Sequence, residues 1–147
     1  MTIFVRHTGI VVQDIEGAID FWVGLLGFSV TVDQKETGPF IDNLLGSENV
    51  QVRTVKMTDS KAVIELLYFK SPAIDKSKME LNSPFVLGLT HIALTVPDIA
   101  LLSNELKLRG YLSIGEPKIS PDGKVLVAYF RTFEGLLLEI VQEIIET

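Results

Sequence analysis

An internal repeat limits the folds that this chain of 147 residues can adopt. His7 and His91 are 84 positions apart, and Asp14 and Asp98 have the same spacing. The spacing between Glu65 and Glu139 is 74, so the first half carries about ten extra residues before its last strand. Self-similarity of this kind indicates two tandem structural modules that share one architecture.

Alternating apolar residues, helix-cap residues and turn residues predict the same element order in both halves. In the first half, the predicted strands and helix are strand 3–12, a helix from Ile15 ended by Gly27, strand 28–32, a short turn or helix at 41–45, and strands 50–57 and 62–69. In the second half they are strand 87–96, a helix from Ile99 to Leu108, and strands 111–114, 124–130 and 136–143. Asp14 and Asp98 are the predicted N-caps of the two helices.

The predicted fold class is α+β, with two tandem βαβββ modules that form a curved, cleft-bearing mixed sheet with the helices outside. The modules cover residues 1–69 and 85–147, and a polar segment with two prolines at 70–84 links them. One such module has a single helix and cannot cover both faces of its sheet, so two modules are expected to make one compact domain. From the pattern alone, a ferredoxin-like α+β sandwich is the alternative.

Composition excludes several classes of function. The net charge of −6 and the pI of about 4.9 argue against binding to nucleic acid, and no basic stripe is present. Without cysteine, the chain has no disulfide, thiolate metal site or cysteine nucleophile. Its apolar runs are far shorter than the ~20 residues that span a bilayer, and the N-terminus lacks the features of a signal peptide. We therefore expect a cytoplasmic protein that binds neither membranes nor nucleic acid.

The candidate site rests on four residues at matching positions of the repeat. His7 and His91 are the only histidines, and both lie among apolar residues. Glu65 and Glu139 each interrupt an otherwise apolar strand, where a carboxylate is costly unless it is paired or binds a metal. Hydrogen-bonded core histidines and outward-facing glutamates are the alternative. The matched positions favour one metal site with the ligands His7, Glu65, His91 and Glu139.

Imidazole and carboxylate ligands suit one divalent ion, namely zinc, nickel, cobalt, manganese, iron or magnesium. Four protein ligands leave positions open for a small substrate with adjacent oxygens. A divalent ion would polarise a substrate carbonyl and ease removal of a neighbouring proton. A carboxylate is then needed as the base, and Glu139, Glu65 and Glu48 are the candidates.

These residues resemble the vicinal oxygen chelate superfamily, which includes glyoxalase I, methylmalonyl-CoA epimerase, extradiol dioxygenases, fosfomycin-resistance enzymes and bleomycin-binding proteins. The matching stretches run through His7–Val12, Phe21–Trp22, Leu25–Phe28, Ile64–Leu66, Leu89–Ala93 and Leu138–Val141. The resemblance implies the metal-ligand set already named. Four ligands are typical of the glyoxalase and epimerase branches, whereas dioxygenases and fosfomycin enzymes use three, so Glu65 discriminates between them. Bleomycin-binding members generally lack the metal ligands.

The chain also departs from the epimerase pattern. That enzyme has a catalytic glutamate on the third strand of its first half, where this chain aligns Arg53 or Gln51. Both are therefore candidate substrate-binding residues, with Arg53 able to hold a carboxylate or phosphate. A solvated strand arginine is the alternative for Arg53.

The leading functional hypothesis is a metal-dependent lyase or isomerase of glyoxalase or epimerase type. An iron-dependent extradiol dioxygenase and a non-catalytic protein that binds a small molecule or antibiotic are the alternatives. The resemblance implies a homodimer, and the modules can pair within one chain or between two.

Overall fold

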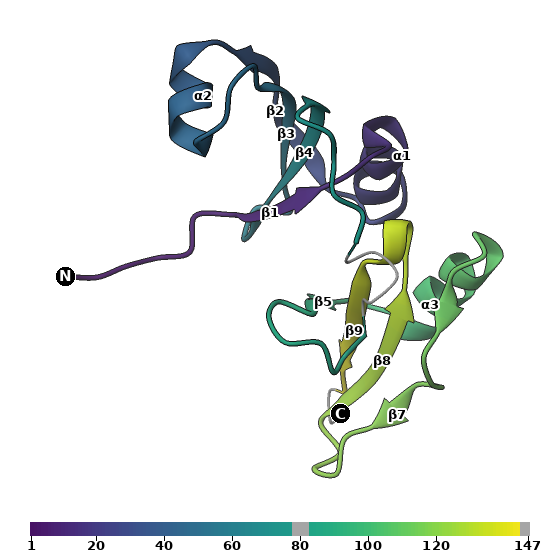
Figure 1. Ribbon diagram of the computed structural model, residues 1–147. Coiled ribbons are helices and arrows are strands. Elements are labelled where there is room, and N and C mark those ends of the chain that lie inside the picture. Colours follow the sequence, from purple (N-terminus) through teal and green to yellow (C-terminus); the bar gives the residue numbers. More distant parts are fainter. Residues whose placement is uncertain (78–82, 145–147) are drawn as a thin grey trace. The chain divides into compact units, whose positions relative to one another are not determined.

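The computed structural model describes residues 1–77 and 83–144, and the chain divides into two compact units (Figure 1). The first unit is Met1–Asp75 and the second is Lys76–Thr147. The predicted linker at 70–84 falls partly outside the described residues. Among the residues described, no helix is long and apolar enough to cross a membrane.

The first unit contains a four-stranded mixed sheet in the order β1-β4-β3-β2. β1 runs parallel to β4, and the other neighbours are antiparallel. In chain order, its elements are β1 Thr8–Val11, α1 Ile15–Ile19, the π-helical turn η1 Asp20–Leu25, β2 Ser29–Thr37, α2 Pro39–Leu45, β3 Gln51–Thr58 and β4 Val63–Ser71.

The second unit repeats this plan in a five-stranded mixed sheet. Its main order is β5-β9-β8-β6, and β7 also pairs with β8. β5 runs parallel to β9, as β1 does to β4. The elements are β5 His91–Thr95, α3 Ile99–Leu108, β6 Leu112–Ser113, β7 Lys118–Ile119, β8 Val125–Arg131, the 3-10 turn η2 Phe133–Gly135 and β9 Leu137–Glu143. The α+β class of two mixed sheets is confirmed, and the ferredoxin-like alternative is not observed.

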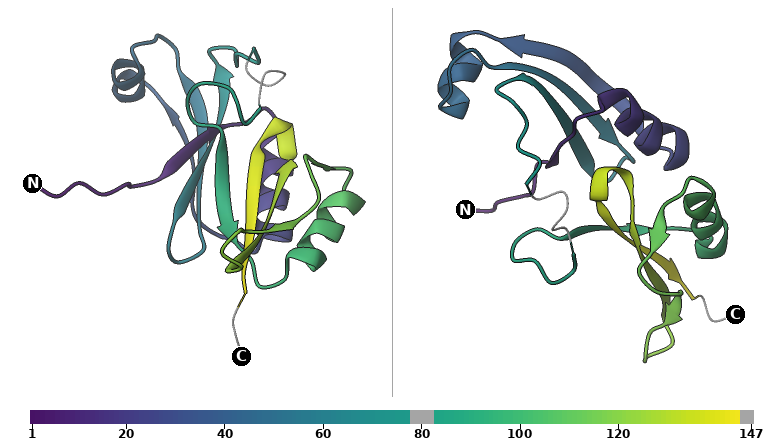
Figure 2. Two further views of the ribbon diagram at one scale, coloured as in Figure 1. Left: turned by 90° about the horizontal axis from the view of Figure 1, so that it is seen from below. Right: turned by 45° about the vertical axis from the view of Figure 1, so that its right-hand side comes forward.

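In the first unit, α1 and η1 lie along one face of the sheet (Figures 1 and 2). Asp14 caps α1 as predicted, since its carboxylate accepts from the backbone N–H of Gly17 at 3.0 Å. Trp22 is 2% exposed and packs edge-on against Phe28, with ring centroids 5.0 Å apart. Met57 and Leu66 of the sheet are fully buried as well, so the main core of this unit lies between the sheet and α1 with η1.

In the second unit, α3 lies against one face of the sheet in the same way (Figure 2). Asp98 caps it as predicted and accepts from the N–H of Leu101 at 2.9 Å. The side chain of Gln142 on β9 accepts from the N–H of Ile99 at 2.8 Å, which ties the helix start to the sheet. Leu106 on the inner side of α3 is fully buried.

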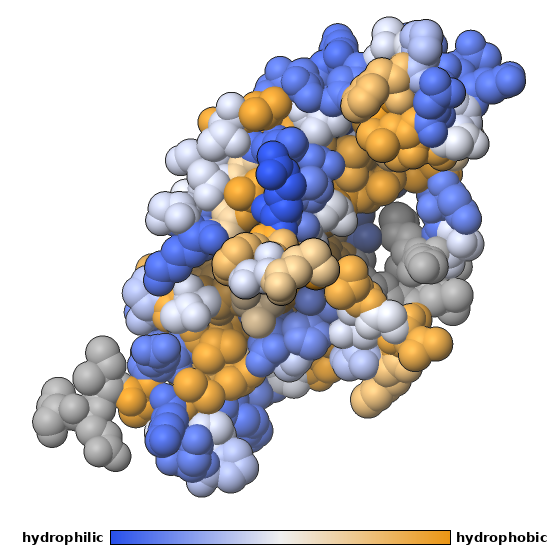
Figure 3. All heavy atoms as spheres, turned by 90° about the vertical axis from the view of Figure 1, so that its left-hand side faces the viewer, coloured by the Kyte–Doolittle hydropathy of each residue, from blue (hydrophilic) through white to orange (hydrophobic). Residues whose placement is uncertain are grey.

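The extra residues of the first half form α2 and the long strand β2. Ile41 of α2 packs on Val50 and Val52, with Leu67 and Phe69 of β4 beside them. Phe40 and Leu44 are 75% and 65% exposed. Figure 3 looks onto the side where α2 and the N-terminus lie in Figure 1, and it shows orange apolar side chains reaching the surface among hydrophilic ones.

The strands differ in length from the sequence prediction for a physical reason. β1 begins at Thr8 rather than at residue 3, because its partner β4 begins at Val63 and offers the earlier residues no backbone groups. β5 begins at His91 for the same reason, since β9 begins at Leu137. β2 extends to Thr37, beyond the predicted end at residue 32, because β3 pairs with the polar stretch that follows. The short strand β7 was not predicted.

Candidate metal centre

One histidine and one glutamate meet in the first unit. Nε2 of His7 lies 3.6 Å from Oε1 of Glu65. Glu65 on β4 is the register partner of Gly9 on β1, and His7 lies two residues before Gly9. Because side chains alternate along extended chain, His7 and Glu65 project from the same face of the sheet.

The second unit places its pair by the same register. Glu139 on β9 is the partner of Ala93 on β5, and His91 lies two residues before Ala93. Nε2 of His91 is 3.0 Å from Oε2 of Glu139. The histidines, which are 84 residues apart, and the glutamates, which are 74 residues apart, therefore occupy equivalent positions in the two sheets.

In the first unit the pair lies on the sheet face away from α1, and in the second unit it lies on the face away from α3. Arg53 forms an ion pair with Glu16 of α1, so its side chain marks the face of the first sheet that α1 covers, called the helix-bearing face below. Lys56 is three residues further along β3, on the other face, where it meets Glu65. In β9, Gln142 contacts the start of α3, and Glu139, three residues earlier, points the other way.

Two neighbours of the glutamates were not predicted from the sequence. Lys56 is the register partner of Glu65 across β3 and β4, with its Nζ 3.5 Å from Oε2. Tyr129 is the register partner of Glu139 across β8 and β9, and its hydroxyl donates to Oε2 at 2.8 Å. The short turn at Thr58–Ala62 fixes the first register, so the hairpin could have revealed Lys56.

Tyr129 also contacts His91 and links the two ligand candidates of its unit. Its hydroxyl is 3.4 Å from Nε2 of His91, and the rings meet edge-on with centroids 5.1 Å apart. Burial raises the pKa of Tyr129, and its hydrogen bond to Glu139 raises it further. The phenol is therefore a hydrogen-bond donor at neutral pH. Thr90 Oγ1 lies 2.8 Å from Nδ1 of His91 and holds the other side of the ring.

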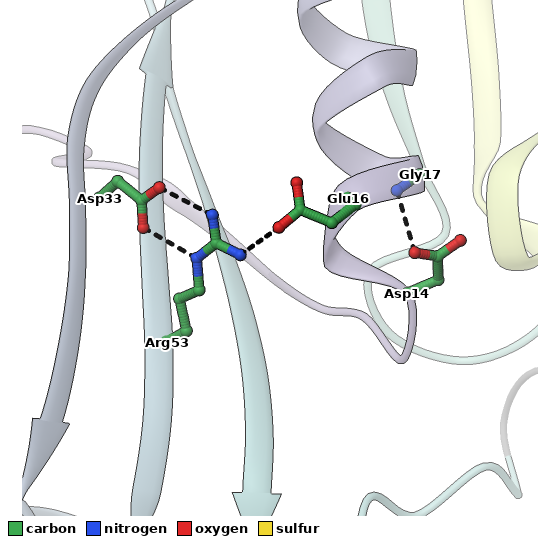
Figure 4. A network of polar contacts seen from close by, with 5 residues as sticks. All are labelled: Asp14, Glu16, Gly17, Asp33 and Arg53. Carbon is green, nitrogen blue, oxygen red and sulfur yellow. Dashed lines mark hydrogen bonds and ion pairs between the residues drawn. The ribbon is translucent and has the colours of Figure 1, made fainter.

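Arg53 is engaged by carboxylates on the helix-bearing face (Figure 4). Its Nε and Nη2 donate to the two oxygens of Asp33 on β2 at 2.9 and 2.8 Å, and its Nη1 pairs with Glu16. The hydrogen bond to Asp33 is the largest cause of the raised pKa of Arg53, and the same bond lowers the pKa of Asp33. The structure therefore does not bring Arg53 together with Glu65.

The other predicted site residues lie apart from the two pairs. Gln51 is exposed at the start of β3. Glu48 is exposed in the loop between α2 and β3, which Asp42 of α2 holds by accepting from the N–H groups of Asn49 and Val50. The roles of Gln51, Glu48 and Arg53 in binding or catalysis stay predictions.

The donor chemistry of both pairs fits a divalent ion. Each unit presents one imidazole nitrogen and one carboxylate, and the glutamate oxygens are held by a neighbouring strand, as is usual around metal ligands. Within residues 1–77 and 83–144, no group of three or more histidine, aspartate and glutamate side chains is gathered to hold a metal. The joint set of His7, Glu65, His91 and Glu139 therefore stays a prediction.

Comparison with known proteins identifies a family for almost the whole chain. Residues 5–140 match the model of the Glyoxalase/Bleomycin resistance protein/Dioxygenase superfamily. No curated protein matches the chain significantly. A crystal structure of a glyoxalase family protein from Bacillus cereus has a TM-score of 0.88 at 23% identity, over 98% of this chain and 96% of that one.

Two further solved structures share the fold. A member of the same superfamily from Sphaerobacter thermophilus has a TM-score of 0.61 at 23% identity, covering 97% of this chain and 98% of that one. A mutant of the fosfomycin resistance protein FosX from Listeria monocytogenes, solved with Mn(II) and 1S,2S-dihydroxypropylphosphonic acid, has a TM-score of 0.62 at 13% identity, covering 95% and 90%. At these identities the likeness shows the fold alone.

Proposed function

The chain belongs to the Glyoxalase/Bleomycin resistance protein/Dioxygenase superfamily, and on that premise we propose that it is a divalent-metal-dependent lyase or isomerase. Its substrate is a small molecule with adjacent oxygens. One observation carries the proposal: a His–Glu pair recurs in both units at the same strand register, on the face away from the helix. FosX with bound Mn(II) supports a metal in this fold.

The ligand set of the proposal is His7, Glu65, His91 and Glu139. A divalent ion bound there would supply Lewis acidity, which lowers the barrier to removing a proton beside a substrate carbonyl. A role as metal ligands would account for two carboxylates within otherwise apolar strands, where burying a charged group is costly. A purely apolar binding surface has no use for these four polar side chains.

The proton in this reaction moves to a carboxylate of the chain. Glu65 lies beside His7 and Glu139 lies beside His91, whereas Glu48 is exposed in the loop before β3. Tyr129 fixes one oxygen of Glu139 by donating to it at 2.8 Å, which restricts the direction in which the carboxylate can accept a proton. We keep all three glutamates as candidate bases.

Substrate binding by Arg53 and Gln51 remains part of the proposal, with a condition for Arg53. Its guanidinium would have to exchange Asp33 or Glu16 for the substrate anion, since both carboxylates occupy it. A homodimer and a cytoplasmic location also stay predictions. Sedimentation of the purified protein would test the first of these.

The decisive experiment measures metal content in untagged protein. We expect about one transition-metal ion per chain in the wild type and little in the double variant Glu65→Gln, Glu139→Gln. A matched control changes two exposed glutamates, Glu105→Gln and Glu143→Gln, and should keep the metal. A wild type that stays empty after dialysis against nickel, cobalt, manganese and zinc would refute the metal-enzyme proposal.

Two further measurements on the same protein test the two alternative functions, an extradiol dioxygenase and a binding protein. Oxygen uptake with catechols under ferrous iron would identify an extradiol dioxygenase. Thermal stabilisation by a ligand that is equal in wild type and in the Glu65→Gln, Glu139→Gln variant would identify a metal-independent binding protein. For the lyase or isomerase, assays begin with 2-oxoaldehyde–thiol adducts and acyl-CoA epimers.

A further inference from the structure

Lys56 stands beside Glu65 on the face of the first sheet that points away from α1. The two residues are direct register partners across β3 and β4. The two oxygens of Glu65 face different neighbours, with Oε1 towards His7 and Oε2 towards Lys56. The Lys56 side chain is 29% exposed, so a ligand in solution can reach it.

The two basic residues of β3 lie on opposite faces of the sheet and have different partners. Arg53 is held by Asp33 and Glu16 on the helix-bearing face. Among the described residues, Lys56 has one ion pair, the 3.5 Å contact of its Nζ with Glu65, which is long for an ion pair of full strength. Strand alternation alone produces this division, because the two residues are three positions apart.

The equivalent position in the second unit has no positive charge. Tyr129 faces Glu139 across β8 and β9 as Lys56 faces Glu65 across β3 and β4. The repeat therefore duplicates the His–Glu pairs but not their neighbours. The first unit therefore has a cation beside its His–Glu pair, and the second unit has a neutral hydroxyl at the equivalent position.

We propose that Lys56 is a specificity-determining residue that binds an anionic group of the substrate, so that the substrate is an acid rather than a neutral carbonyl compound. This inference rests on the proposed function. The charges of Glu65, Glu139 and a divalent ion sum to zero, and Lys56 adds one positive charge. A substrate with one carboxylate brings the total charge to zero, whereas a neutral substrate leaves a net charge of +1 at the site.

The test compares two small chelators that differ in charge. Glycolate and hydroxyacetone both present two adjacent oxygens, and glycolate alone is an anion. Their dissociation constants are measured on Mn(II)-loaded protein by the relaxation of water protons. The variants are Lys56→Met, Lys56→Arg and the control Lys61→Met, which removes an exposed lysine from the turn between β3 and β4. Metal content is measured first in every variant.

We expect Lys56→Met to raise the dissociation constant of glycolate about tenfold and to leave that of hydroxyacetone within twofold. Loss of one hydrogen bond to a charged group has about a tenfold effect on affinity. Lys56→Arg should restore most of the glycolate affinity, and Lys61→Met should change neither ligand. Equal weakening of both ligands, or no weakening of glycolate, would overturn the proposal for Lys56. A wild type without metal would instead refute the proposed function.

Discussion

Tyr129 reaches across from β8 and donates a hydrogen bond of 2.8 Å to Glu139 on β9. The bond joins two register partners on the face away from α3, and the same hydroxyl lies 3.4 Å from His91. Side chains that orient metal ligands in this way typically change metal affinity by 10- to 100-fold when removed.

Tyr129→Phe should therefore weaken metal binding by about tenfold or more while the fold stays intact. Tyr68→Phe is the matched control, because Tyr68 lies on β4 opposite Arg53, on the helix-bearing face. Competition with a fluorescent chelator measures the affinity, and circular dichroism checks the fold. Unchanged affinity in Tyr129→Phe would show that Glu139 does not need this hydrogen bond or is not a ligand.

Removal of the metal should lower the melting temperature. An ion present at 100 times its dissociation constant stabilises the folded state by about 2.7 kcal/mol. For a chain of this size, that corresponds to roughly 5–10 °C. Calorimetry before and after a chelator measures the change, and re-addition of metal should reverse it. The Glu65→Gln, Glu139→Gln variant should be insensitive to the chelator, and sensitivity equal to that of wild type would contradict the ligand assignment.

Arg53→Gln should destabilise the first unit by about 0.5–1 kcal/mol, since its partners are partly exposed and solvent screens the ion pairs. Urea unfolding measures the loss. Lys118→Gln, which removes an exposed charge from β7, is the control and should change stability little.

The loss of stability in Arg53→Gln should depend on pH in a defined direction. Arg53 lowers the pKa of Asp33 below its ordinary 3.8, so the pair stabilises the folded state fully above that value. The stabilisation is lost as the pH falls through the lower, folded-state pKa. The difference between wild type and Arg53→Gln should thus be constant from pH 7 to about 5 and shrink below about 4. A difference that grows on acidification would exclude this account of the network in Figure 4.

Asp98→Ala should lower the free energy of unfolding by about 1 kcal/mol, because it removes the acceptor that caps α3 at the N–H of Leu101. Asp98→Asn should retain most of the stability, since an asparagine oxygen can accept the same bond. Urea unfolding at neutral pH compares the two. An equal loss in both variants would mean that the negative charge, rather than the cap, stabilises the helix.

Much of the fold was predictable because its signals are local. The caps at Asp14 and Asp98 and the alternation in β3, β4, β8 and β9 are visible in short windows of sequence. The strand ends were not predictable in this way. β1 and β5 start where β4 and β9 first offer backbone partners, and this depends on residues more than 45 positions away.

The residues of the candidate site were likewise predictable only in part. The repeat singled out His7, Glu65, His91 and Glu139, because these polar residues interrupt apolar stretches at matching positions of the two halves. It did not single out Lys56 and Tyr129, which look like ordinary strand residues until pairing places each opposite a glutamate. Arg53 attracted attention as a cation, and its engagement by Asp33 and Glu16 depends on three separate elements.

The sequence by itself therefore determined the α+β modules, their order and the four polar residues that repeat within them. Composition and periodicity act through local preferences and through burial of apolar side chains, which short stretches of chain encode. Only the tertiary structure decided that each His–Glu pair lies on the face away from its helix, and that Lys56 rather than Arg53 meets Glu65. The pairing register of the strands decides both points, because a shift of one residue moves every side chain of a strand to the opposite face.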